Sequence, residues 1–299
     1  MKQLLVIGSM NMDFVTHLDH MPAVGETILA QGLELVPGGK GANQAYAMGK
    51  LGGHATLLGA VGADSQGAKL CDNLASVGVD VSRVLHLEDA ATGMAVIGVQ
   101  PQGDNSIIVL PGANSRVTPD YIRQNLDVLE ASDIVVLQLE IPLETVVYAA
   151  QTAKRLGKQV ILDPAPAVAH LPEDLFPCLD LIKPNETELG ILTGRPYEPA
   201  RLREDALSLQ AKGVRRVLVT LGGAGSYLLR EDGSQEFFQA DPHVTVVDTT
   251  AAGDSFVGAL AVSLSRGRDL ADAARFASRV ADIVVSRPGA QSSIPYLEE

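Results

Sequence analysis

The sequence has no tryptophan, two cysteines and only 4% aromatic residues among its 299 positions. Two cysteines, Cys71 and Cys178, cannot build a disulfide framework, so we expect inert thiols of a cytosolic protein. No apolar run approaches the ~20 residues that a membrane-spanning helix needs. The apolar stretch within Met1–Gly8 is too short for a signal peptide and is more typical of a first strand. These absences point away from secreted, disulfide-rich and membrane proteins.

Positive charge is also scarce, because 23 Lys and Arg face 36 Asp and Glu, for a net charge of −13. This balance argues against a nucleic-acid partner. An acidic protein that binds a phosphate must attract it locally, through backbone N–H groups, a lysine or a metal ion. The six histidines show no metal-ligand spacing, and we assign them no role.

What the sequence does contain is an alternation of short Val, Ile and Leu runs with helical periodicity. Continuous apolar runs of this kind are typical of strands buried on both faces of a parallel sheet. Helices are expected from Thr118 through Leu129, then over Leu143–Leu156, Ala200–Lys212 and Leu270–Val285. The expected strands are Leu4–Ile7, Ala55–Leu58, Ile134–Leu139, Val160–Leu162, Leu181–Ile182 and Val217–Thr220. The pattern predicts a three-layer, doubly wound α/β fold, with ligands beyond the carboxyl ends of the strands.

Two stretches break the alternation. Residues 14–36 contain β-type residues, Gly and Pro but no helical pattern, and Gly93–Leu110 contains two strand patterns around a turn. Together they could form a small separate sheet, and a small sheet over an α/β site suggests a lid. An ordinary edge hairpin fits these patterns nearly as well. The expected boundaries of the lid are about 12–37 and 92–111, within one domain over 1–299.

The segment Val247–Phe256 joins a strand-like run, His243–Val247, to a helix-like run, Ser255–Leu264. Ala251, Ala252 and Gly253 leave the backbone open to a ligand, and the first turn of a helix offers free N–H groups and a positive dipole. A carboxylate beside such a site, that of Asp254, fits an enzyme that deprotonates one group while stabilising charge on another. Taken alone, the segment fits an ordinary helix cap equally well.

A second glycine-rich segment, Pro37–Ala45, precedes a helical pattern through Leu51. It is not a P-loop, because no Ser or Thr follows the Gly-Lys pair. Gly8–Asp13 follows the first strand but lacks a dinucleotide fingerprint, which weakens a dehydrogenase reading. Asn11 and Asp13 would point the same way on an extended segment and could hold vicinal hydroxyls, although both are also common turn residues.

Three further strand ends carry polar groups. Glu140 follows Ile134–Leu139 and faces either the crevice or solvent. Asn185 caps a helix in the simplest interpretation, or lies with Glu188 near Mg²⁺ through water. Thr220–Gly225 is a small-residue turn that could cradle an adenine nucleotide, although such turns are common.

Together these segments resemble the ribokinase-like (PfkB) family of carbohydrate kinases over nearly the whole chain. Both family signatures are present, one around Gly38–Asp64 and the other over Asp248–Phe256. The second, with Ala-Ala-Gly-Asp at 251–254, is highly specific. The resemblance implies a three-layer, mostly parallel α/β sheet with a small β-sheet lid, which often builds a homodimer.

The resemblance also implies a reaction, in which Asp254 takes the proton from the 5-hydroxyl of D-ribose and that hydroxyl attacks the γ-phosphate of ATP. The backbone N–H groups of Ala251, Ala252 and Gly253 would form the anion hole. The positions that match the sugar site are Asn11, Met12, Asp13, Gly39, Lys40, Gly41, Ala42, Asn43, Glu140 and Asp254.

For the nucleotide and the metal ions, the resemblance implies further sites. The nucleotide positions are Asn185, Thr220, Leu221, Gly222, Gly223, Ala224, Gly225, Gly253 and Ser278. Mg²⁺ would lie near Asn185 and Glu188. A monovalent cation, usually K⁺, would be bound by oxygens of Asp248, Thr250, Val284, Arg287, Gly289 and Ser293, largely from the backbone.

Some positions depart from the family pattern. Asp163 stands where Asn is common, and Pro288 stands where a basic residue is common. Both bear on specificity and cation affinity, but neither removes a catalytic group. The alternatives are a kinase for another pentose or nucleoside, such as 2-deoxyribose or pseudouridine, and a sugar-binding regulator without catalysis. The second would show damage at Asp254, Gly253 or Lys40, and all three are intact.

Overall fold

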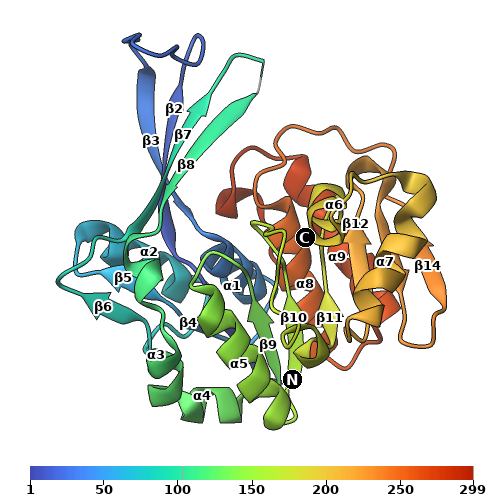
Figure 1. The fold of residues 1–299 in the computed structure, drawn as a ribbon. Coiled ribbons are helices and arrows are strands. Elements are labelled where there is room, and N and C mark those ends of the chain that lie inside the picture. Colours follow the sequence, from blue (N-terminus) through green and yellow to red (C-terminus); the bar gives the residue numbers. More distant parts are fainter. Residues whose placement is uncertain (103, 299) are drawn as a thin grey trace.

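The computed structural model describes residues 1–102 and 104–298. Its main sheet has eight strands in the order β14-β13-β12-β11-β10-β9-β1-β4 (Figure 1). The six strands from β12 to β4 are parallel, whereas β13 pairs antiparallel with both β12 and β14. Their bounds are β1 Leu4–Ile7, β4 Ala55–Leu58, β9 Ile134–Leu137, β10 Gln159–Leu162, β11 Leu181–Ile182, β12 Val217–Thr220, β13 Ser226–Leu229 and β14 Gln235–Phe238.

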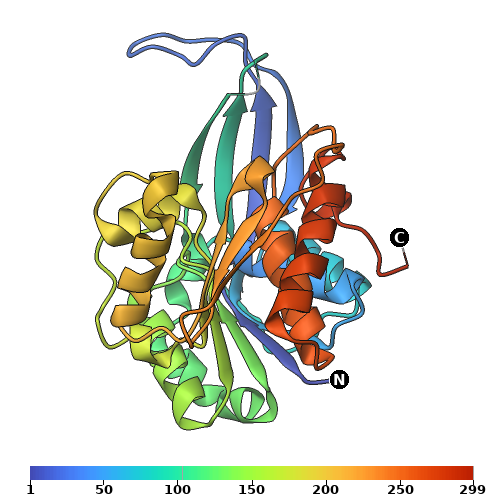
Figure 2. The ribbon, with the colours of Figure 1, turned by 90° about the vertical axis from the view of Figure 1, so that its right-hand side faces the viewer.

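Alternate side chains of each strand enter two separate cores. On β9, Ile134 and Val136 join one hydrophobic cluster, whereas Val135 and Leu137 join the other. All four side chains are fully buried, as expected for a strand covered on both faces. Figure 2 shows the resulting three layers, with helices on either side of the main sheet. The predicted fold class is confirmed.

The helices divide between the two cores. The first face carries α1 Lys40–Lys50, α2 Ser65–Ser76, α8 Ala252–Ser265 and α9 Leu270–Val285. The second face carries α3 Pro119–Gln124, α4 Leu126–Ala131, α5 Leu143–Arg155, α6 Glu186–Thr193 and α7 Leu202–Ala211. Short 3₁₀ turns lie at Gly112–Arg116, Phe176–Cys178, Pro199–Arg201, Gly222–Ala224 and Gln291–Ser293.

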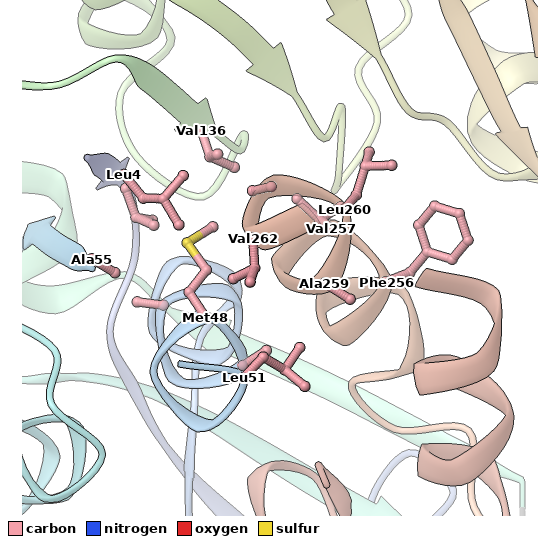
Figure 3. Close-up of a cluster of buried hydrophobic side chains, with 14 of the residues drawn as sticks. Leu4, Met48, Leu51, Ala55, Val136, Phe256, Val257, Ala259, Leu260 and Val262 are labelled. Atoms are coloured by element: carbon pink, nitrogen blue, oxygen red, sulfur yellow. The ribbon is translucent and has the colours of Figure 1, made fainter. Parts of the chain in front are cut away.

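Helix α8 is buried on all sides from Ser255 to Ser265, which is typical of a helix at the centre of a core. In Figure 3, Met48 of α1 points into the space between Leu4 of β1 and Val262 of α8. The two helices approach closely at Gly258, where a Cβ would come within 2.6 Å of the Ala47 side chain. This contact packs the middle of α8 against α1, and the hydrogen bond from Asn43 to Asp254 brings the first turns of the two helices together.

A second, four-stranded sheet projects from the main body (Figure 1). Its order is β3-β2-β7-β8, with β2 Asn11–His17, β3 Gln31–Gly38, β7 Gly93–Val99 and β8 Asn105–Leu110. These strands are the two stretches that break the alternation in the sequence. Strands β5 Ala60–Gly62 and β6 Leu85–Leu87 form a small parallel pair at its base. Every residue of β8 is exposed, so one edge of this sheet is uncovered in the single chain.

Two local predictions were wrong. The helix expected from Thr118 is interrupted at Asn125, whose side-chain amide donates to the carbonyl of Tyr121 and competes with the backbone ladder. The strand expected over His243–Val247 is a loop, because an Asp241 turn begins it and the Val247 N–H donates to Val285 of α9 instead of to a strand. Within the described residues, the helices are too short or too polar to cross a membrane.

Candidate active site

A cavity of about 670 Å³ opens at the carboxyl ends of the parallel strands. Its walls come from the ends of β10, β11 and β12, the beginning of α8, one side of α9 and the loop over residues 240–246. This is the position where doubly wound α/β folds bind their ligands. The predicted site residues that line it are Lys40, Asn185, Glu188, Thr220, Gly222, Gly223, Gly225, Ala251, Ala252, Gly253, Asp254 and Ser278.

The beginning of α8 provides an anion site. Ala251 has φ 60°, a left-handed conformation that costs a non-glycine residue roughly 1–2 kcal/mol. Ala251, Ala252 and Gly253 line the cavity, and the first-turn N–H groups of a helix, such as that of Gly253, have no acceptor within the helix. The Ala252 N–H donates to the Thr249 carbonyl at 3.2 Å. Together with the positive end of the helix dipole, first-turn N–H groups favour a phosphate there.

Asp254 lies just inside this first turn and is 6% exposed. The Asn43 side-chain amide donates to its Oδ2 at 2.9 Å, and the Gln44 amide donates to its Oδ1 at 3.1 Å. The Asp254 carboxylate, followed by Asp163 and Glu140, raises the pKa of Lys40 well above its usual range against the effect of burial. The lysine therefore stays cationic, so the cavity combines a fixed base with a fixed positive charge.

Sequence reasoning missed an ion pair at the floor of the cavity. Lys183, which follows β11, lies 2.9 Å from Asp163, which follows β10. A Cβ on Gly253 would lie 3.5 Å from the Lys183 ammonium, so this charge borders the anion site. The Gln44 amide donates to Asp163 at 2.8 Å and joins the pair to Asp254. The only signal in the sequence was a charged residue at the end of each of two neighbouring strands.

The predicted sugar residues meet on the other side of Lys40, at the base of the second sheet. Glu140 accepts hydrogen bonds from the Ser9 hydroxyl at 2.5 Å and from the Lys40 backbone N–H at 3.0 Å. The Asn11 side chain accepts one from Asn114 at 2.7 Å. Ser9 and Asn114 were not predicted, because neither lies in a recognisable motif. Polar groups from four distant segments therefore converge here.

Asp13 is the most strongly perturbed carboxyl of the sugar group. Burial, followed by repulsion from Glu140 and Asp254, raises its pKa to about 7. A Cβ on Gly38 would lie 2.2 Å from its Oδ2, so only glycine fits opposite it. Three carboxyl groups and Lys40 thus share one region, which suits a ligand with several hydroxyl groups.

Some predicted sugar residues can contribute only their backbone. The side chains of Met12 and Ala42 belong to the hydrophobic core. The Ala42 N–H donates to Ser9, and Gly41 packs on the backbone of Gly8, so these residues mainly hold the loop together. Gly39 has φ 86° and precedes α1, which lets the chain turn into the helix beside Lys40.

The nucleotide positions fall on the far side of the cavity. Leu221 is buried in the second core and Ala224 does not line the cavity, unlike their neighbours in the same turn. The loop that was expected to be a strand supplies the apolar wall residues Val244 and Val246, which line the cavity together with Val285 of α9. This apolar slot was not predicted, since the β-type residues that form it resemble a strand in the sequence.

Asn185 and Glu188 form a capping box at the beginning of α6. The Asn185 side chain accepts from the Glu188 N–H at 2.8 Å, and the Glu188 carboxylate accepts from the Asn185 N–H at 2.7 Å. Burial raises the pKa of Glu188, with the nearby Lys183 opposing the shift. Both residues border the cavity, so they cap α6 and are also within reach of a ligand in the cavity.

The predicted cation residues lie next to the anion site. The carboxylate of Asp248 accepts hydrogen bonds from Thr250 and from the Gly289 N–H. These bonds outweigh the effect of burial and lower the pKa of Asp248. Ser293 is buried in the same loop, while Val284 lies at the end of α9 and Arg287 just beyond it. Within the described part of the chain, no group of three His, Cys, Asp or Glu side chains is placed to hold a metal ion.

Comparison with known proteins agrees with this geometry. The model of the pfkB family of carbohydrate kinases matches residues 1–297, and the chain belongs to that family. The ribokinase of Haemophilus influenzae is 38% identical over 299 residues, which are 100% of this chain and 97% of that protein. The deoxyribokinase of Salmonella typhi is 37% identical over 297 residues, with 99% and 96% covered.

Among solved structures, ribokinase from Arabidopsis thaliana complexed with ribose and ATP has a TM-score of 0.93 at 35% identity. The match covers 99% of this chain and 96% of that one. The family resemblance drawn from the sequence, and the fold that it implied, are therefore confirmed.

Proposed function

We propose that the protein is an ATP-dependent kinase that phosphorylates the 5-hydroxyl of D-ribose, giving ribose 5-phosphate and ADP. The observation that carries this proposal is the buried carboxylate of Asp254, held at the beginning of α8 between a polar pocket and a 670 Å³ cavity. The ribokinases among its relatives support ribose as the sugar and ATP as the donor.

In this mechanism Asp254 accepts the proton of the 5-hydroxyl, and the oxygen attacks the terminal phosphorus of ATP while the bond to the ADP oxygen breaks. The amides of Asn43 and Gln44 hold the carboxylate still. The backbone N–H groups at Ala251, Ala252 and Gly253 stabilise the negative charge on the transferred group. Positioning and charge neutralisation supply most of the rate acceleration in phosphoryl transfer.

The sugar lies at the base of the second sheet. There the carboxylates of Asp13 and Glu140 accept hydrogen bonds from its hydroxyls, and the side-chain amide of Asn11 can both accept and donate. The backbone from Gly39 to Asn43 closes the opposite side. The second sheet, over about residues 12–37 and 92–111, acts as a lid that excludes water from the transferred phosphate. Its attachment next to Asp13 supports this role, because sugar contacts and lid strands share one segment.

ATP occupies the cavity, with its base near Thr220–Gly225, Ser278 and the apolar slot. Mg²⁺ would be held near Asn185 and Glu188, where carboxylate and amide oxygens suit a hard cation, and it neutralises charge on the phosphates when bound. Lys183 and Lys40 supply the fixed cations that an acidic protein needs here.

A monovalent cation, K⁺ by the family resemblance, would be held by oxygens around Asp248, Thr250, Val284, Arg287, Gly289 and Ser293. The donor set fits, because it is all oxygen and Asp248 stays anionic through its lowered pKa. The hydrogen bond from Gly289 to Asp248 links the end of the chain to the segment that forms the anion hole. The cation supplies positive charge next to that segment.

The exposed edge strand of the lid, β8, supports the proposal of a homodimer. Ile107, Ile108, Val109 and Leu110 on β8 are all exposed, at the uncovered edge of the second sheet. A row of exposed apolar residues on an open edge favours pairing with another strand. A second copy of this chain supplies such a strand.

A specific observation keeps 2-deoxyribose as the second candidate, because the Salmonella typhi deoxyribokinase is about as similar as the ribokinases. Asn11 and Asp13 favour a sugar that has the 2-hydroxyl, since buried polar groups without a partner disfavour the deoxy analogue.

The test is ADP release with ATP, Mg²⁺ and K⁺ on D-ribose, 2-deoxyribose, fructose, pseudouridine and 5-deoxyribose. We expect kcat/KM for ribose to exceed that for 2-deoxyribose by on the order of tenfold or more. 5-Deoxyribose, which lacks the acceptor hydroxyl, serves as the matched control and should release no ADP. Faster turnover of 2-deoxyribose than of ribose would make 2-deoxyribose the preferred substrate. If none of the sugars is turned over, the proposed kinase activity is wrong.

A further inference from the structure

Two chains of side-chain amides converge on the carboxylate of Asp254. In the first, Asn73 of α2 donates to Gln291 at 2.5 Å, Gln291 donates to Asn43 at 2.9 Å, and Asn43 donates to Asp254 Oδ2 at 2.9 Å. The first chain therefore begins at a partly buried helix surface and ends at the base.

The second chain is shorter. Gln138, which follows β9, donates to the carbonyl oxygen of Gln44 at 2.6 Å, and Gln44 donates to Asp254 Oδ1 at 3.1 Å. Gln44 and Gln138 are fully buried, and Asn43 and Gln291 nearly so. Neither Gln291 nor Gln138 touches the base, so their effect on it passes through another amide.

Each amide has a donor end and an acceptor end, so a chain of amides has a direction. Asn43 turns its NH₂ group toward Asp254 because its oxygen already accepts from Gln291. Gln291 presents its NH₂ group to Asn43 because its own oxygen accepts from Asn73. The donor that stabilises the Asp254 carboxylate is thus fixed by a residue three hydrogen bonds away.

We propose that Asn73 and Gln291 are positioning residues that orient the amide of Asn43, so that its NH₂ group faces Oδ2 of the Asp254 carboxylate. This proposal rests on the function proposed above, in which Asp254 is the base. The ionised, correctly turned carboxylate is the form that accepts the sugar proton. Reversing a chain replaces a donor by a carbonyl oxygen and disfavours that form.

An isosteric substitution far from the base can reverse the first chain. Asn73→Asp removes the only donor at its beginning and leaves acceptors, so Gln291 must turn its NH₂ group toward α2. Asn43 then turns its own NH₂ group toward Gln291 and its oxygen toward Asp254. Asn73→Ala cuts the same link without reversing it, and Ala75→Asp adds a charge to an exposed position on α2 as a control.

The kinetic test measures kcat at saturating ribose and ATP against pH. Lys40 and Asp13 interact electrostatically with Asp254, and Asp163 is joined to it through Gln44, with Lys183 as its ion-pair partner. All four charged groups are unchanged in these variants. For Asn73→Asp we expect kcat to fall by on the order of tenfold and its acid limb to move up by about one pH unit. Asn73→Ala should lie between the wild type and Asn73→Asp, because it removes the orienting donor without reversing the chain. Ala75→Asp should match the wild type, with the acid limb in place.

A coupling measurement shows that the effect travels through Gln291. In a Gln291→Leu background, Asn73→Asp should cause no further loss, since the chain is already broken. Equal loss from Asn73→Asp and Asn73→Ala, or persistence of the loss in the Gln291→Leu background, would overturn the proposal.

A readout without substrates separates this proposal from the proposed function. The side-chain NH₂ signals of Asn43 in NMR spectra should respond to pH in the wild type and in Asn73→Ala, but not in Asn73→Asp, in which the NH₂ group points away from the Asp254 carboxylate. This pattern supports the amide chain even if no sugar is phosphorylated. An unchanged response in Asn73→Asp would overturn it even in an active kinase.

Discussion

Lys183 and Asp163 form a buried ion pair of 2.9 Å at the meeting point of the anion site and the base. Their side chains are 4% and 2% exposed, so neither charge is solvated. A buried pair of this kind contributes little net stability, but removal of one partner leaves an uncompensated charge. Because the Lys183 ammonium also borders the anion site at Gly253, stability and phosphate binding depend on the same side chain.

Lys183→Met should therefore lower the free energy of unfolding by about 3 kcal/mol and lower kcat/KM for ATP. The double variant Asp163→Asn, Lys183→Met should recover most of the stability but not the activity, because the positive charge is still missing. Denaturant unfolding and steady-state kinetics measure the two effects. Lys154→Met is the control, since Lys154 is partly exposed and its partner Asp180, at 3.7 Å, also pairs with Arg215 at 2.8 Å. This variant should cost less than about 1 kcal/mol. Full recovery of kcat/KM in the double variant would exclude a role in phosphate binding.

Gly253→Ala should impair phosphate binding at the anion site without lowering the stability of the fold. Gly253 does not have a positive φ, and its Cβ would meet only the Lys183 ammonium, so the variant should be as stable as the wild type. The methyl group enters the space beside the anion site, and we expect kcat/KM to fall on the order of a hundredfold. Thermal unfolding and ADP release test this pair of expectations. A stable variant with wild-type kcat/KM would place the transferred phosphate elsewhere.

Asp13 should make ribose binding dependent on pH. With a pKa raised to about 7, the carboxyl group is partly protonated at neutral pH without sugar, and it accepts hydroxyl hydrogen bonds best when ionised. The KM for ribose should therefore rise as the pH falls from 8 to 6. Asp13→Asn should raise KM at every pH and remove this dependence. A parallel pH dependence in the variant would assign it to another group.

The raised pKa of Asp13 also makes the free energy of unfolding fall as the pH rises from 4 to 7. The folded state holds a proton on Asp13 that the unfolded state, with a pKa of 3.8, releases. Stability contributed by this proton is present near pH 4 and is lost as the pH rises toward 7, by at most about 1.4 kcal/mol per pH unit. Asp13→Asn should thus be more stable than the wild type at pH 7, with the difference shrinking toward pH 4. A difference that grows toward low pH would contradict the raised pKa.

The exposed row on β8 predicts the state of assembly. Ile108 is 65% exposed in the single chain, so Ile108→Asp should leave folding intact while converting a dimer into monomers. Sedimentation equilibrium measures this directly. Val168→Asp, at an exposed apolar residue away from the second sheet, should leave the dimer unchanged. A monomeric wild type, or a dimeric Ile108→Asp variant, would exclude the lid as the interface.

Local patterns predicted the layers of this fold well. In a short continuous apolar run such as Ile134–Leu137, successive side chains point to opposite faces of the sheet. Both faces must therefore be covered, which implies helices on the two sides of the sheet. Small residues before a helix and an acid in its first turn indicated a candidate anion site, but the same pattern fits an ordinary helix cap equally well, and the family resemblance was needed to favour the site. Asn125 and His243–Val247 escaped prediction, since a side chain that competes with the backbone and a loop drawn to α9 depend on tertiary contacts.

The contacts around the base were less predictable. Nothing in the sequence brings Gln291 to Asn43, because 248 residues separate them and neither has a periodic pattern. The Lys183–Asp163 pair likewise arises only because β10 and β11 are neighbours in the sheet. The sequence shows that these polar and charged residues are present, but only the order of the strands in the folded sheet shows which of them are partners.

The most direct test of the central claim is a single-turnover measurement on Asp254→Asn with ribose and ATP bound. We expect both ligands to bind within a few-fold of their wild-type affinity by calorimetry, because the amide keeps the shape of the carboxyl group. Rapid-quench sampling should show phosphoryl transfer slowed on the order of a thousandfold, since the general base is lost. If Asp254→Asn transfers phosphate to the 5-hydroxyl at the wild-type rate, Asp254 is not the base and the account is wrong.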